Sequence, residues 1–81
     1  MIYELEVYSS SVKPVIHIEK ILIQKGFIRT GRKVAREGLC KAPTFFVDIK
    51  LSGRAYNYEF IFNVDNKQLE EVKGLFMEEF I

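Results

Sequence analysis

Hydrophobic and polar residues alternate in three segments of the chain, and this alternation is typical of strands with one buried face. The last two segments are separated by Ser52-Gly53-Arg54, a combination typical of a tight hairpin turn. We therefore expect these two strands to pair in antiparallel orientation. The three segments are residues 3–8, 44–51 and 56–64. The side chains expected on their buried face are Tyr3, Leu5, Val7, Phe45, Val47, Ile49, Leu51, Tyr56, Tyr58, Phe60, Phe62 and Val64.

Two other segments have the hydrophobic period of a helix. From Val12 to Lys25 the apolar residues share one broad sector, and Gly26 follows at the position where a left-handed backbone often ends a helix. After residue 64, Asp65 and Gln68 have the spacing of a capping box, which predicts the start of a second helix. The apolar stripe of that helix is formed by Leu69, Val72, Phe76 and Phe80.

The rest of the chain completes a predicted α+β domain. Residues 27–34 are interpreted as a further strand, weakened by Gly31, and residues 35–43 as a loop. The element order is then β-α-β-β-β-α, a mostly antiparallel sheet with two helices packed on one face to cover its aromatic side. The first strand could pair beside the second or beside the fourth. With 81 residues, we expect a single domain that spans residues 1–81.

The cysteine content and the apolar runs set expectations about location. Cys40 is the only cysteine, so no internal disulfide can form, and a lone thiol favours a reducing compartment. The first residues lack the basic region of a signal peptide, and no apolar run reaches the roughly 18–20 residues that span a bilayer. We therefore expect a cytoplasmic protein that does not associate with membranes.

The charges are unevenly distributed, although the formal net charge is only +1. The basic segment, residues 25–41, has six basic residues against one acidic residue, a formal charge of +5. The rest of the chain has six basic and ten acidic residues, a formal charge of −4. Clustered cations suit phosphates or an acidic protein surface, and they also keep an exposed loop soluble. The candidate binding residues of the basic segment are Arg29, Arg32, Lys33, Arg36 and Lys41.

The second candidate surface is the outer face of the predicted sheet, which points away from the expected helices. Strand parity places apolar side chains there, and Phe46 and Ile61 are expected to be cross-strand neighbours. Such a group could anchor a protein interface, including a homodimer. Carboxylates on the same face argue against nucleic acid there, because they repel phosphates. The candidate anchors are Tyr8, Phe46 and Ile61.

Residue types that carry out catalysis or bind metals occur only singly or in pairs. Asp48 and Glu59 are expected to face each other across the hairpin, but no third ligand for a cation is evident. Glu19 falls at the edge of an apolar helix face, and the only histidine, His17, has no partner at zinc spacing. Cys40 has no histidine close in sequence. We therefore expect no enzymatic activity, no cofactor and no metal.

The stretch Lys41 to Arg54, KAPTFFVDIKLSGR, resembles the central strands of double-stranded-RNA-binding domains. The order helix, three strands, helix is similar to that family and to the small HicA-type toxins. The RNA-binding family has a lysine cluster at the start of its last helix, where this chain has residues 65–71, DNKQLEE. The toxins have a histidine on a central strand, whereas His17 lies on the first predicted helix. No functional residue is carried over from either family.

Size and surface chemistry together favour a small non-enzymatic binding protein that occupies a partner protein's surface. It would act as a regulator or inhibitor of the kind that phages and mobile elements encode. The basic segment and the outer face are the expected contact surfaces. The alternative is nucleic-acid binding through the basic segment. A third hypothesis is that the same segment sequesters a small phosphorylated ligand.

Overall fold

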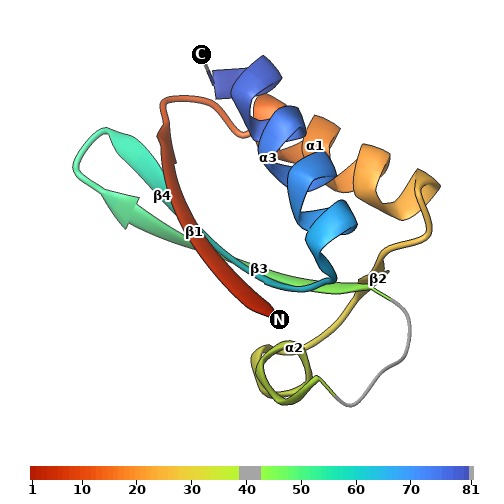
Figure 1. The fold of residues 1–81 in the computed structure, drawn as a ribbon. Helices are drawn as coiled ribbons and strands as arrows, with labels where there is room; N and C mark the ends of the chain where they lie inside the picture. Colours follow the sequence, from red (N-terminus) through yellow and green to blue (C-terminus); the bar gives the residue numbers. More distant parts are fainter. Residues whose placement is uncertain (39–42, 81) are drawn as a thin grey trace.

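The computed structural model describes residues 1–38 and 43–80, which form a mixed four-stranded sheet with three helices (Figure 1). The strands lie in the order β1-β4-β3-β2, in which β4 is antiparallel to both neighbours and β2 is parallel to β3. This arrangement confirms an α+β domain. The elements are β1 (Ile2–Ser9), α1 (Lys13–Gln24), β2 (Ile28–Arg29), α2 (Arg32–Glu37), β3 (Thr44–Ser52), β4 (Ala55–Asn63) and α3 (Asn66–Phe80).

Helices α1 and α3 cover one face of the sheet, as predicted (Figure 1). The core beneath them is aromatic, and Phe45, Phe60 and Phe62 are fully buried. The rings of Phe60 and Phe62 stack with centroids 5.7 Å apart, and Phe76 from α3 meets Phe60 edge-on at 5.0 Å. Aromatic pairs in these geometries stabilise beyond their buried area, so they hold α3 firmly on the sheet.

The ends of the two long helices follow from local sequence. Pro14 occupies the first turn of α1, where a missing N–H costs little. Gly26, just after α1, has a φ of +95°, in the region that glycine adopts without strain. The predicted capping box of α3 is confirmed, because the backbone N–H of Asp65 and that of Gln68 each donate to the other's side-chain oxygen at 2.8 Å. Within the described ranges, none of the helices is long and apolar enough to cross a membrane.

The first strand lies beside the fourth, which decides between the two pairings that the sequence left open. β1 pairs with β4 along all eight of its residues. The pairing continues to Met1, whose amino group donates to the Val64 carbonyl oxygen at 2.7 Å, while the Val64 N–H donates back at 3.0 Å. Since β4 also pairs with β3, β4 is central and β1 is an edge strand.

The predicted strand over residues 27–34 is wrong beyond Arg29, because the chain then forms α2 between Gly31 and Gly38. Gly38 has a φ of +66°, and a Cβ there would lie 2.6 Å from the Asn63 side-chain nitrogen, so glycine suits this helix end. Six helical residues are too few to show a clear period, which is why the pattern does not predict α2. The predicted antiparallel meander is also corrected, since the chain crosses over through α2 and β2 runs parallel to β3.

The far end of the β3–β4 hairpin extends beyond the two long helices (Figure 1). Ile49 and Leu51 were expected on the buried face, and they share the strand parity of Phe45. They are nevertheless 47% and 78% exposed. The expectation of burial is wrong for these two residues because strands about 30 Å long extend past the cover that the helices provide.

Candidate functional site

The short helix α2 lies over the outer face of the sheet, on the side opposite to α1 and α3 (Figure 1). Its Arg32 donates from Nη1 to Glu59 Oε1 at 2.5 Å and from Nη2 to Asp48 Oδ2 at 3.4 Å. Arg36, one turn later, pairs with Glu4 on β1. The basic segment and the outer sheet face, predicted as two separate surfaces, therefore contact each other within the molecule.

The position of Arg32 explains how the sheet accommodates two opposed carboxylates. Asp48 and Glu59 are directly opposite each other on β3 and β4, as predicted. Like charges at such positions are destabilising, and the guanidinium between them offsets the repulsion. The guanidinium carbon also lies 4.9 Å from the ring centroid of Phe46, within cation–π range. The cation held by this pair of carboxylates is thus the protein's own arginine.

The three predicted apolar anchors of the outer face differ in exposure. Phe46 and Ile61 are cross-strand neighbours, as predicted. Ile61 is fully buried, as is Ala35 of the covering helix, and Phe46 is partly buried. Tyr8, beyond the helix, is 61% exposed. A partner protein can reach Tyr8 in this conformation, but it cannot reach Ile61 unless α2 moves.

Two other cations of the basic segment, Arg29 and Lys33, make only loose contacts. Arg29 lies 3.9 Å from Glu19, and Lys33 lies 3.9 Å from Glu37 on the same helix. Exposed pairs at this distance contribute little to stability. The structure therefore brings two of the candidate residues, Arg32 and Arg36, into close ion pairs. The residues of interest that lie outside the described ranges are Cys40 and Lys41.

Two further titratable side chains, His17 and Tyr58, lie away from α2. His17 Nδ1 lies 2.6 Å from Glu79 Oε1 and links α1 to α3. The Tyr58 hydroxyl is buried and has no hydrogen-bond partner in the described part of the chain. Burial raises the pKa of Tyr58, with further contributions from Tyr56 and Glu19, so this hydroxyl stays protonated at neutral pH. In residues 1–38 and 43–80, no three His, Cys, Asp or Glu side chains come together as metal ligands would.

The outer side of β1 is a free edge, since no strand in the described part of the chain lies beyond it. The reciprocal hydrogen bonds between Met1 and Val64 show which residues of β1 bond to β4 through their backbone. In antiparallel strands, pairs of opposite residues that share two hydrogen bonds alternate with pairs that share none. Tyr3, Leu5 and Val7 therefore bond to β4. The residues whose N–H and C=O groups point away from the sheet are Ile2, Glu4, Glu6 and Tyr8.

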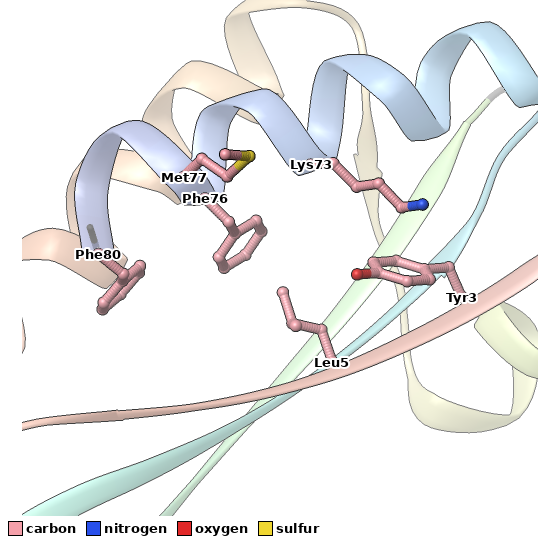
Figure 2. A pocket seen from close by; sticks show the side chains of 6 residues that line it. All are labelled: Tyr3, Leu5, Lys73, Phe76, Met77 and Phe80. Carbon is pink, nitrogen blue, oxygen red and sulfur yellow. The ribbon is translucent and has the colours of Figure 1, made fainter.

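An apolar groove of about 260 Å³ lies between this free edge and α3 (Figure 2). Figure 2 shows side chains of β1 and of α3 pointing toward each other across it. At its rim, Met77 is 60% exposed. At one end, the Lys73 ammonium lies 5.7 Å from the ring centroid of Tyr3. The groove is lined by Tyr3, Leu5, Lys73, Phe76, Met77 and Phe80.

This groove is not predicted by the sequence pattern, although most of its lining residues are. Tyr3 and Leu5 were assigned to a buried strand face, and Phe76 and Phe80 to a buried helix stripe. In the structure Tyr3, Leu5 and Phe80 are only partly buried. The pattern did not show that β1 lies at the edge of the sheet. There the apolar face of β1 and the apolar stripe of α3 meet, and no further strand in the described part of the chain closes the gap between them.

No protein-family model, no curated protein and no solved structure matches this chain. The function is therefore inferred from the geometry of the β1 edge and its groove.

Proposed function

We propose that this protein is a non-enzymatic binding protein that docks on a partner protein by accepting a strand of that partner at the β1 edge. One observation carries the proposal: free backbone groups and an apolar groove lie along the same strand. Strand addition uses both features, because main-chain hydrogen bonds supply affinity and pockets for alternate side chains supply specificity. By occupying a segment of its partner, the protein would act as a regulator or inhibitor.

The β1 edge supports this role better than the two surfaces expected from the sequence. Arg32 and Arg36 are already paired with carboxylates of the sheet, and a phosphate would have to compete with Glu59 and Glu4 for them. An apolar partner at the outer face would have to displace α2 to reach Ile61. A strand added to β1 requires neither rearrangement.

A proline on the free edge tests the proposal. The N–H of Glu6 points away from β4, so Glu6→Pro removes an edge donor and leaves the hydrogen bonds between β1 and β4 in place. Glu6→Ala removes the same carboxylate but keeps the donor, and it is the matched control. We expect proteins captured from nuclease-treated host lysate to be lost with Glu6→Pro and to persist, at most several-fold weaker, with Glu6→Ala, as measured by affinity capture and mass spectrometry.

Thermal melting of both variants shows whether they remain folded. Capture that is unchanged in a folded Glu6→Pro variant would contradict docking at the edge. Capture that disappears on nuclease treatment alone would favour the nucleic-acid alternative.

A further inference from the structure

A strand added to β1 would meet two different chemical environments. Successive side chains of a strand point to opposite faces of the sheet. Partner residues beside Tyr3 and Leu5 would lie on the groove side, and those beside Glu4 and Glu6 would lie on the side of α2. The two faces along this edge can therefore select different residue types at alternate positions.

The groove side favours apolar side chains. Five of the six lining residues are apolar, and one of these five, the flexible Met77 at the rim, can adapt to different shapes. At about 260 Å³, the groove is smaller than the roughly 300–1,000 Å³ of typical small-molecule sites. It therefore suits individual side chains of an extended segment better than a cofactor.

The α2 side favours cations. Glu6 is exposed, lies beside Glu59 of β4, and makes no ion pair with the described residues. Glu4, two positions earlier on the same face, is paired with Arg36. A lysine or arginine opposite Glu6 would gain an attractive cross-strand contact, whereas a carboxylate there would be repelled.

The same charges disfavour a second copy of this chain as the added strand. Two β1 strands that pair about a two-fold axis do so in antiparallel orientation. With the axis at Glu4, Leu5 or Glu6, a glutamate lies opposite a glutamate, whereas an axis at Val7 avoids this but leaves the first residues of β1 unpaired. Like charges at these positions are destabilising, so the edge suits a different chain.

We infer that the β1 edge binds an extended segment of a partner protein in which apolar residues alternate with lysine or arginine. This inference rests on the proposed function, because it specifies which strand the edge accepts. The apolar residues occupy the groove, and a cation faces Glu6, whose carboxylate makes no ion pair with the described residues.

Three peptides matched to β1 in length test this specificity with the full chain. The first alternates lysine with leucine, the second alternates glutamate with leucine, and the third has the composition of the first with all lysines before all leucines. We expect the alternating lysine peptide to bind about twofold to thirtyfold more tightly than the glutamate peptide, because an attractive contact at Glu6 replaces a repulsive one. It should also bind more tightly than the third peptide, which cannot place apolar and cationic residues on opposite faces. Fluorescence anisotropy measures the three affinities, and the preference for lysine should weaken as salt is raised.

Charge reversal on the edge supplies the matched variants. Glu6→Lys should abolish or reverse the preference between the two alternating peptides. Glu70→Lys makes the same charge change at an exposed position of α3 that does not line the groove, and it should leave the preference unchanged. Met77→Glu places a carboxylate at the groove rim and should weaken the binding of both alternating peptides.

The outcomes separate this inference from the proposed function. Equal binding of the two alternating peptides, lost in Glu6→Pro, would overturn the charge specificity and leave docking at the edge intact. Peptide binding that Glu6→Pro does not affect would overturn both. A concentration-dependent dimer that Glu6→Pro abolishes in sedimentation experiments would identify a second copy as the occupant and overturn the inference.

Discussion

The two faces of the sheet are covered in different ways. On one face, α1 and α3 enclose a stacked aromatic core that includes Phe60 and Phe62. On the other face, α2 contributes six residues, of which Ala35 is the buried one. Its arginines, Arg32 and Arg36, attach it to carboxylates of the strands. One cover is therefore held by a large apolar area, and the other by a small apolar contact and a few partly exposed charges.

Because of this difference, opening α2 alone should need less free energy than unfolding the whole domain. Burial of a large apolar side chain stabilises a domain by roughly 1.5–3 kcal/mol, whereas an exposed ion pair contributes about 1 kcal/mol or less. Screening by salt weakens exposed pairs but has little effect on the aromatic core. We therefore expect the face under α1 and α3 to determine the free energy of unfolding. Helix α2 should open locally with a lower free energy, which depends on salt.

The largest loss of stability is expected on the face under α1 and α3. Phe60→Ala should lower the free energy of unfolding by about 3–5 kcal/mol, the range for truncated core aromatics. That is a large part of the roughly 5–15 kcal/mol that stabilises a typical domain. Urea denaturation measures the change, and a midpoint close to that of the parent protein would show that the aromatic core is not the main source of stability.

An intermediate loss of stability is expected at Ile61, which points to the face under α2. Ile61 is as fully buried as Phe60, but its cover is the short helix α2. Ile61→Ala should cost about 2 kcal/mol, the low end of the range for this substitution, because α2 can settle into the space. If the same denaturation experiment gave a loss equal to that of Phe60→Ala, the two covers would be equally rigid and the comparison would fail.

The smallest effect is expected at the ion pairs of α2. Arg32→Ala should cost about 1 kcal/mol or less at low salt and less again at high salt, since it leaves Asp48 and Glu59 facing each other. Lys33→Ala, which removes a cation with an 85% exposed side chain from the same helix, should cost almost nothing. Denaturation curves at two salt concentrations test this pair, and equal losses for both variants would rule out a specific role for Arg32.

Most of the fold was predictable because it depends on local patterns. The capping box of Asp65 and Gln68 and the hairpin around Gly53 need only a few neighbouring residues, and both form as expected. Helix α2 was not predictable, because six residues joined to the sheet by long-range ion pairs have little local signal of their own. The partner of β1 was also undetermined, because its alternating pattern fits either neighbour equally well.

The candidate site was predictable only in part, because it depends on which segments meet in space. The sequence identified a basic segment and an acidic face, but the residues that join them, Arg32 and Glu59, are 27 positions apart. It also assigned Leu5 and Phe76 to buried faces without showing that a groove separates them. Exposure at a sheet edge follows from strand order, which the periodicity of single strands does not determine.

The pairing of β1 with β4 has a consequence for the order in which the protein assembles during synthesis. The hairpin of β3 and β4 can close within microseconds once both strands are made, whereas the contact between Met1 and Val64 spans 63 positions. At roughly 5–20 residues per second, a few seconds separate the synthesis of β1 from that of β4. During this interval β1 has two unpaired edges, and nascent β1 strands on neighbouring ribosomes could join. Like-charge repulsion between Glu4 and Glu6 of the two chains would oppose this joining, before β4 is available to pair with β1.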